Sequence, residues 1–119
     1  MLEPDTRNAA EILANAAEVA LSRYHKMAVS DTSAFSDDDL TLLDAIAMQL
    51  QVVGEKVKKI EQLSPGLLHQ HGVNAKPIIR MRDFLSHHYE NVDYNSIIET
   101  CRDYLPDLAQ KIENLLDKG

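Results

Sequence analysis

A short stretch in the second half of the chain, "RMRDFLSHHYENVDY" from Arg80 to Tyr94, concentrates side chains that bind anions and transfer protons. Histidine titrates near neutral pH and can accept or donate a proton. Arginine keeps its positive charge and matches a phosphate with a planar fork of donors. Cleavage of a phosphodiester by an internal 2′-hydroxyl needs a base, an acid and a cation, so these residue types suit it without a metal ion.

Helical geometry does not place these groups on one face. At about 100° per residue, Arg82 shares a face with Tyr89 and Ser86 if the helix continues that far. His87 lies about 140° round from Arg82, and His88 about 120° the other way. Arg82 and His87 can therefore meet one substrate through the long arginine side chain, a frayed helix end or a second subunit. The alternative is a solvated helix end whose histidine interacts with the helix dipole.

Composition favours one all-α domain over residues 1–119. The chain is 45% apolar and 26% charged, with 5% aromatic residues, four glycines and four prolines. This supplies enough aliphatic residues for a core of packed helices and few turn residues for a strand-rich fold. The net charge of −7 argues against a protein that coats nucleic acid by bulk charge, although a local basic site stays open.

The single cysteine, Cys101, excludes an internal disulfide and suits a reducing compartment. The first residues, "MLEPDTRNAAEI", have no apolar signal segment, and no apolar run reaches the length of a membrane span. We therefore expect a soluble, cytoplasmic protein that does not bind a membrane.

Apolar residues at helical spacing predict an up-and-down bundle of four or five helices. Ser36 and Asp39 form a capping-box pattern, Asn74 and Asp93 are further N-cap candidates, and "SPGLLHQHGVN" is expected to be irregular. The expected helices cover roughly residues 6–28, Ser36 to Leu63, Asn74 to His88, Asp93 through Cys101, and Pro106 onward.

The segment "RDFLSHHY" fits the R-x4-H-x-Y signature of HEPN-domain ribonucleases, with Arg82, His87 and Tyr89 in the three places. The surroundings resemble the HepT branch, the toxin half of type VII-like HepT/MntA toxin–antitoxin pairs. "LQVVGEKVKKI", with its Gly54-Glu55 pair, is similar to the second helix of that branch, and "NVDY" with "YLPDLAQKIENLL" resembles its carboxy-terminal part. The resemblance covers most of the chain from Leu40 to Leu116.

The resemblance implies a HEPN bundle that forms a homodimer with a shared cleft. It also implies metal-independent endoribonuclease activity on RNA, with Arg82 and His87 as catalytic residues and no cofactor. The partner would be a minimal nucleotidyltransferase antitoxin that transfers AMP onto Tyr89. The added phosphate would repel RNA and fill the cleft beside the catalytic residues.

Asp83 departs from the family pattern, which usually has Asn after the motif arginine. Ionised Asp accepts hydrogen bonds without donating, so Asp83 could pair with Arg82 and weaken its attraction for phosphate. It could instead orient a histidine. Arg80 and Lys76 are candidates for supporting phosphate contacts. The alternative function is a non-catalytic HEPN regulatory module that binds a nucleotidyltransferase partner or a nucleotide.

Other residues have structural interpretations. Lys56, Lys58 and Lys59 suggest the basic last turn of the second helix. His69 and His71 lack the further ligands that a metal site needs. Tyr94 and Tyr104 are expected to pack with solvated hydroxyls, and Cys101 to be a small buried side chain.

Overall fold

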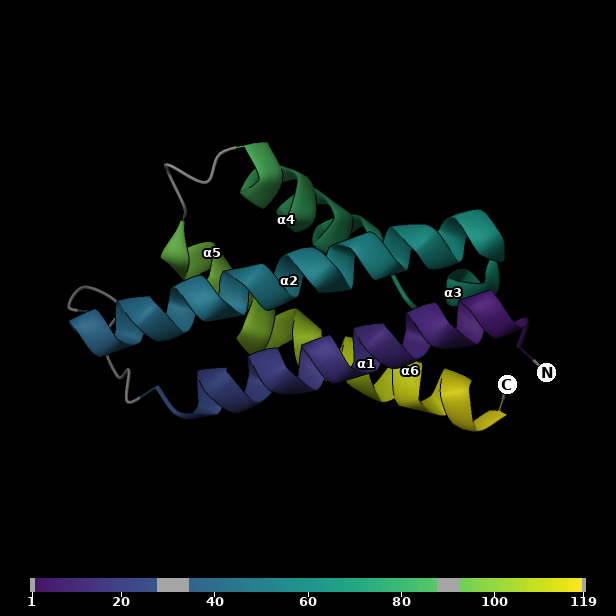
Figure 1. Cartoon of the computed structure of the whole chain (residues 1–119), viewed down its shortest axis with the longest axis horizontal. Helices are drawn as coiled ribbons and strands as arrows, with labels where there is room; N and C mark the ends of the chain where they lie inside the picture. Colours follow the sequence, from purple (N-terminus) through teal and green to yellow (C-terminus); the bar gives the residue numbers. More distant parts are fainter. Residues whose placement is uncertain (1, 28–34, 88–92, 119) are drawn as a thin grey trace.

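The computed structural model describes residues 2–27, 35–87 and 93–118, and this part of the chain forms helices and turns without a strand. The predicted all-α bundle is therefore confirmed. Figure 1 shows the helices arranged as successive antiparallel runs. They are α1 (Pro4–His25), α2 (Asp37–Leu63), the short α3 (Leu67–Gln70), α4 (Lys76–His87), α5 (Tyr94–Glu99), the π-helix η2 (Thr100–Tyr104) and α6 (Leu105–Lys118).

The helices α1 and α2 form the long central pair of the bundle (Figure 1). α2 begins at the predicted capping box, in which Ser36 Oγ accepts from the Asp39 N–H and the Asp39 carboxylate accepts from the Ser36 N–H. α1 contributes a narrow seam of buried small residues around Leu13, which lets the two helices approach closely. Its buried alanines are Ala9, Ala10, Ala14, Ala16, Ala17 and Ala20.

α4 packs on the side of α2 away from α1 (Figure 1) and buries little of its own surface. Ile78 and Leu85 are its buried side chains. Gly54 of α2 makes the contact close, because a Cβ at that position would overlap the Cβ of Arg82 and lie 3.0 Å from the Ile78 carbonyl oxygen. The absence of a side chain at position 54 therefore sets the separation between α2 and Arg82.

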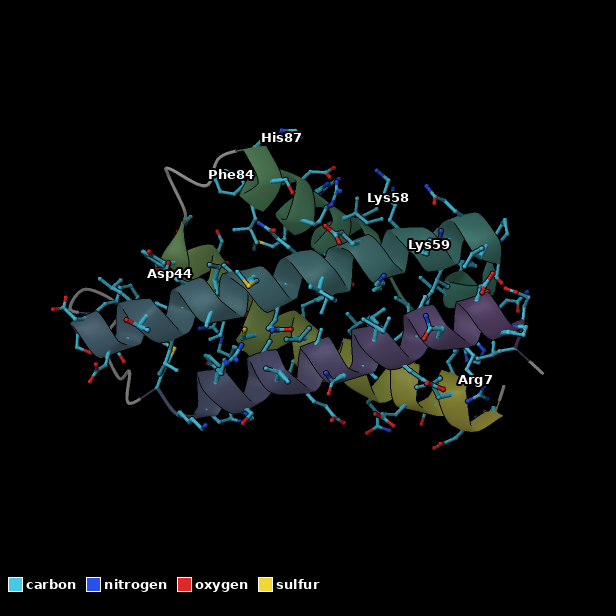
Figure 2. All side chains as sticks on the ribbon, viewed as in Figure 1. Arg7, Asp44, Lys58, Lys59, Phe84 and His87 are labelled. Atoms are coloured by element: carbon cyan, nitrogen blue, oxygen red, sulfur yellow. The ribbon has the colours of Figure 1, made fainter. Side chains whose placement is uncertain are left out.

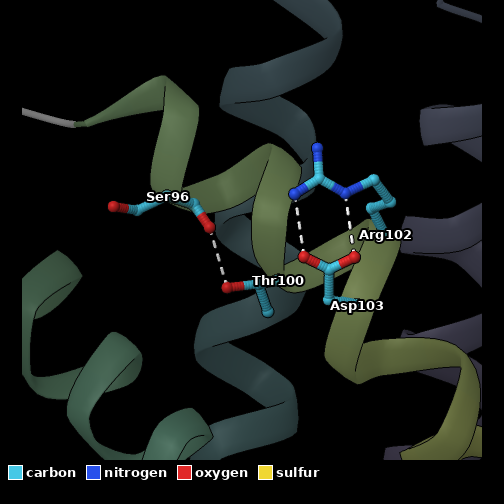
Figure 3. A network of polar contacts seen from close by, with 4 residues as sticks. All are labelled: Ser96, Thr100, Arg102 and Asp103. Atoms are coloured by element: carbon cyan, nitrogen blue, oxygen red, sulfur yellow. Dashed lines mark hydrogen bonds and ion pairs between the residues drawn. The ribbon is translucent and has the colours of Figure 1, made fainter.

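The last two predicted helices are joined into one run by η2. Pro106 has no backbone N–H, and its ring clashes with the carbonyl four residues back in a regular α-helix. The Leu105 N–H bonds to the Thr100 carbonyl, five residues back, as in a π-helix. The side chains of this turn also interact locally: Arg102 pairs with Asp103, and the Thr100 hydroxyl donates to the Ser96 carbonyl at 2.8 Å (Figure 3).

Several local predictions need correction. The stretch "SPGLLHQHGVN" is not wholly irregular, because Leu67–Gln70 forms α3 and buries Leu68 in the core. Helix α1 ends at His25, before the predicted end. The lysines at positions 56, 58 and 59 do not form the last turn of α2, which continues to Leu63. The turn "ENVD" lies mostly outside the described residues.

Two further predictions about local structure are confirmed. Asp93 caps α5, since its Oδ1 accepts from the Asn95 and Ser96 N–H groups at 3.1 and 3.4 Å. Cys101 is fully buried, and desolvation raises the pKa of its thiol to about 12. Across the described ranges, none of the helices combines the length and the apolar character needed to span a membrane.

Candidate active site

Arg82 lies on α4 where that helix touches α2. Its Cβ and Cγ contact the surface left open by Gly54, and its side chain is 27% exposed. Its Nε is buried and has no hydrogen-bond partner among the described residues. The aliphatic part and Nε of Arg82 are thus enclosed by helix packing, while Nη1 reaches the partly exposed Asp83.

The Asp83 carboxylate accepts a hydrogen bond from the guanidinium group of Arg82. Arg82 Nη1 donates to Asp83 Oδ1 at 2.8 Å, and the Asp83 side chain is 49% exposed. The prediction that Asp83 pairs with Arg82 is confirmed. This hydrogen bond lowers the pKa of Asp83 below its usual value, with a further lowering from the charge of Arg82. Asp83 therefore stays ionised at neutral pH, as an anion attached to the motif arginine.

Lys58 and His87 add two more groups around the Asp83 carboxylate. Their positive charges also lower the pKa of Asp83. Because Asp83 and His87 are four residues apart, they are neighbours on one face of α4. Lys58 comes from α2, one turn beyond Gly54, and extends on the side where α4 lies (Figure 2). Asp83 is thus hydrogen-bonded to Arg82 and lies within the electrostatic influence of one cation from α2 and one proton-transferring side chain from α4.

The hydrogen bond to Asp83 brings the Arg82 side chain round α4 toward the face that carries His87. The long arginine side chain reaches round the helix to Asp83, and Asp83 is one turn from His87. The other suggested role of Asp83, orienting a histidine, stays a prediction, and a positive charge on His87 contributes to the lowered pKa of Asp83. His87 is exposed in the last turn of α4 (Figure 2), where it can meet a substrate.

The two candidate supporting cations line different cavities. Lys76 is exposed at the start of α4 and lines a cavity of about 620 Å³ between α2, α3 and α4. Arg80 is also exposed but lines a smaller cavity of about 250 Å³ between α4 and α5, together with Phe84 and Ser96. Neither residue joins the Asp83 cluster directly.

Lys58 is the site residue that sequence reasoning missed. The run of lysines groups it with Lys56 and Lys59 as a helix end. The available signal was its spacing of four from Gly54, which places Lys58 on the face of α2 that meets α4. Because side chains tilt toward the amino end of a helix, Lys58 reaches back toward the level of Gly54.

The motif tyrosine, Tyr89, and its neighbour His88 lie outside the described residues. The hydroxyls of Tyr94 and Tyr104, predicted to be solvated, each also donate an exposed hydrogen bond within the protein. Tyr94 donates to Asp44 Oδ1 at 2.8 Å, and Tyr104 donates to the Asn74 carbonyl at 2.6 Å. Within the described part of the chain, no group of three or more His, Cys, Asp or Glu side chains is arranged to hold a metal ion.

Comparison with known proteins identifies the family of this chain. Residues 17–115 match the model of the family described as "Ribonuclease HepT-like". The chain belongs to the HepT-like ribonuclease family. The matched range contains α2 and α4 in full, and with them Gly54, Lys58, Arg82 and His87.

Relatives of this HepT-like chain carry ribonuclease names. A protein from Caldanaerobacter subterraneus subsp. tengcongensis, named "Putative RNase TTE0752", is 33% identical over 81 residues, which are 67% of this chain and 70% of the relative. Two proteins from Methanocaldococcus jannaschii, named "Putative RNase MJ1216" and "Putative RNase MJ0125", are each 33% identical over 73 residues, 60% of this chain. The match spans 58% and 60% of their lengths, less than two thirds. No solved structure matches this chain significantly.

Proposed function

We propose that this HepT-like chain is a metal-independent endoribonuclease that uses Arg82 and His87. The observation that carries the proposal is the cluster around Asp83. Its carboxylate accepts from Arg82 and lies in the field of Lys58 and His87. Because phosphate oxygens and carboxylate oxygens attract the same donors, the cluster indicates where the scissile phosphate would bind. Membership of a ribonuclease family supports this interpretation.

The proposed reaction is transfer of the phosphorus from O5′ to O2′ of the RNA. A base removes the 2′-hydroxyl proton, O2′ bonds to phosphorus, and the bond from phosphorus to O5′ breaks. O5′ takes a proton from an acid, leaving a 2′,3′-cyclic phosphate and a 5′-hydroxyl. His87 performs one proton transfer, while Arg82 and Lys58 stabilise the charge that develops on the phosphate oxygens.

A homodimer would complete this chemistry. The reaction needs both a base and an acid, and one copy contributes a single His87 to the Asp83 cluster. A second copy would contribute another His87 to a shared cleft, which is the arrangement that resemblance to HEPN ribonucleases implies. We therefore include a dimer in the proposal.

We also propose that the chain is the toxin of a toxin–antitoxin pair. The motif tyrosine, Tyr89, follows His87 by two residues. A partner nucleotidyltransferase would join AMP from ATP to the Tyr89 hydroxyl and release pyrophosphate, placing negative charge beside Arg82. Incubation with the partner and ATP should add the mass of AMP to the wild type and not to Tyr89→Phe. Modification at Tyr94 or Tyr104 would contradict this assignment.

The second candidate function is a non-catalytic regulatory module. The specific observation in its favour is the bond between Arg82 and Asp83, which occupies one donor of the motif arginine. This function predicts binding of a nucleotidyltransferase partner or a nucleotide without RNA cleavage, and it predicts no gain of cleavage when Asp83 is replaced by Asn.

The deciding experiment measures cleavage of a short RNA by the purified chain in the presence of EDTA. Wild type should produce a 2′,3′-cyclic phosphate, and His87→Ala should lower the rate about a hundredfold or more, because general acid–base catalysis contributes that much. An RNA with a 2′-deoxy residue at the cleaved position should stay intact. Cleavage of that substrate, or equal rates for wild type and His87→Ala at equal helix content, would refute the proposed mechanism.

A further inference from the structure

The larger cavity lies at the start of α4, the helix that also carries Arg82 and Asp83, and has the size of a small-ligand site. Its volume is about 620 Å³, within the range of pockets that hold small molecules. It is formed where α2, the segment after α3 and the start of α4 meet. The residues that line it are Glu61, His69, Gly72, Val73, Asn74, Ala75, Lys76 and Ile79.

One face of α4 connects this cavity to the candidate active site. Positions 76, 79, 83 and 87 fall within about 80° of one another on a helix. Lys76 and Ile79 line the cavity, and Asp83 and His87 belong to the site. Lys76 precedes Arg82 by six residues, or about 9 Å along the helix axis at 1.5 Å per residue. A strand bound at Asp83 therefore needs a short continuation along α4 to reach the cavity.

The wall of the cavity is held in place by the carboxy-terminal helical run. The Tyr104 hydroxyl donates to the Asn74 carbonyl at 2.6 Å, and Lys111 Nζ donates to the Gly72 carbonyl at 2.8 Å. Burial raises the pKa of Tyr104 to about 12, so its hydroxyl keeps the proton that it donates. Gly72 has a φ of 76°, a turn conformation that glycine adopts without strain. These contacts preorganise the segment that faces α4.

We propose that this cavity binds the nucleotide next to the scissile phosphate in the RNA strand, an inference that rests on the proposed ribonuclease function. Val73, Ala75 and Ile79 supply an apolar surface for the base. Lys76 supplies a cation at the rim for the adjoining phosphate. Single-stranded RNA is bound in this way, with bases against apolar or aromatic walls and phosphates against basic side chains.

Glu61 gives the subsite a preference among bases. Glu61 is a partly exposed residue, and its carboxylate is the acidic group among the cavity's lining residues. An ionised carboxylate accepts hydrogen bonds without donating them. It therefore favours a base edge with an exocyclic amino group, such as cytosine N4, and disfavours the carbonyl O4 at the same place in uracil. The subsite thus takes an amino-bearing base and discriminates against uracil.

The test measures binding of fluorescent 2′-O-methyl tetranucleotides, one of cytidine and one of uridine, by fluorescence anisotropy. These probes lack the 2′-hydroxyl nucleophile and stay intact. The wild type should bind the cytidine probe about fivefold to tenfold more tightly, as expected for one charge-assisted hydrogen bond at a partly exposed site. Glu61→Gln should abolish that preference, since an amide can donate to uracil O4. Lys76→Ala should weaken the binding of both probes by a similar factor, because a phosphate contact carries no base preference.

Two control variants match these changes in charge at distant positions. Glu99 lies on α5 and Lys26 lies at the end of α1. The Glu99→Gln and Lys26→Ala variants should bind the probes as the wild type does. Equal affinity of wild type for the two probes, a preference retained in Glu61→Gln, or no binding of either probe would overturn the subsite. Cleavage of unmodified RNA is measured separately. If RNA is cleaved but the probes show no base preference that depends on Glu61, this inference alone is refuted. If the probes bind with that preference but RNA is not cleaved, the ribonuclease function alone is refuted.

Discussion

The chain contains two ion pairs between sequence-adjacent Arg and Asp residues, Arg82–Asp83 in α4 and Arg102–Asp103 in η2. The two pairs differ in geometry. In η2, Arg102 donates from Nε and Nη2 to both carboxylate oxygens, each at 2.8 Å (Figure 3). In α4, Arg82 donates from Nη1 to one oxygen of Asp83 at 2.8 Å. The Arg102 and Asp103 side chains are 56% and 61% exposed, whereas those of Arg82 and Asp83 are 27% and 49% exposed.

The difference separates a surface ion pair from a candidate anion site. A bidentate pair directs the main fork of Arg102 donors to its own neighbour, so less of the guanidinium is presented to a ligand. Arg82 is positioned instead by packing against Gly54, and the charge of Lys58 contributes to the lowered pKa of its partner Asp83. The residue types alone therefore do not identify the site, and the surrounding helix does.

The largest expected effect comes from removing Arg82, and removing Arg102 is the matched comparison. Arg82→Gln should lower kcat/KM for RNA cleavage about a hundredfold or more, the usual effect of deleting a donor that stabilises transition-state charge. Arg102→Gln should change it less than about twofold, because that arginine pairs with Asp103 on the surface. Initial rates on one RNA measure both. Similar losses in the two variants would remove the distinction between the pairs.

Gly54→Ala tests whether packing positions Arg82. Alanine is the better helix former by about 1 kcal/mol, so a position without close neighbours would gain stability. At position 54 the new Cβ would overlap Arg82 and crowd the Ile78 carbonyl, and we expect a net loss of about 1–3 kcal/mol together with reduced cleavage. Met48→Ala, at a side chain 68% exposed on the same helix, is the control and should stay within about 0.5 kcal/mol. A Gly54→Ala chain that is more stable in urea and fully active would contradict the packing argument.

Replacing each aspartate by asparagine measures how strongly Asp83 restrains Arg82. Asp83→Asn removes an anion beside the proposed phosphate position, and one charge at about 4 Å in water is worth roughly 1 kcal/mol. We expect KM for RNA to fall about fivefold. Asp103→Asn removes the equivalent charge from η2 and should leave KM unchanged. An Asp83→Asn chain with a higher KM would mean that the carboxylate assists catalysis.

The smallest expected effect is on stability in acid. Hydrogen bonds from Arg102 and Arg82 lower the pKa of Asp103 and of Asp83 below 3.8. Each carboxylate therefore contributes stability that is present above pH 3.8 and is lost as pH falls through the folded-state pKa. Melting temperatures should be slightly lower in Asp103→Asn than in wild type at pH 6, and the gap should narrow as the pH falls below 3.8 and through the folded-state pKa of Asp103. Because both groups are exposed, 1 M NaCl should shrink the gap. A difference in melting temperature that persists in acid would contradict a stabilising contribution from the ionised Asp103 carboxylate.

The parts of the fold that depend on local signals were predictable from the sequence. The Ser36–Asp39 capping box and the Asp93 cap involve residues within one turn, and the long apolar patterns of α1 and α2 repeat many times. Helix α3 was missed because four residues carry too little periodicity, and its stability comes from burying Leu68 against the core. The π-helix was not predictable, because a proline usually opens a new helix and Pro106 therefore indicated a break between two helices.

The candidate site was predictable only along one helix. The motif identified Arg82 and His87, and the identity of Asp83 suggested its pairing with Arg82. Lys58 and the cavity around Glu61 depend on how α2 meets α4, and the spacing within α2 indicates this only once the close approach at Gly54 is known. Gly54 could have supplied that link, because a glycine in the middle of a helix usually marks a close approach by another chain segment.

The π-helix has a consequence for how this chain relates to its homologues in evolution. A π turn accommodates one more residue than an α turn over the same length, so it behaves as a single-residue insertion within a continuous helix. One extra residue rotates the later part of the helical run by about 100°, so α5 packs on α2 while α6 packs on α1. Homologues with no proline at the position of Pro106 should therefore align with a one-residue gap within Thr100–Tyr104.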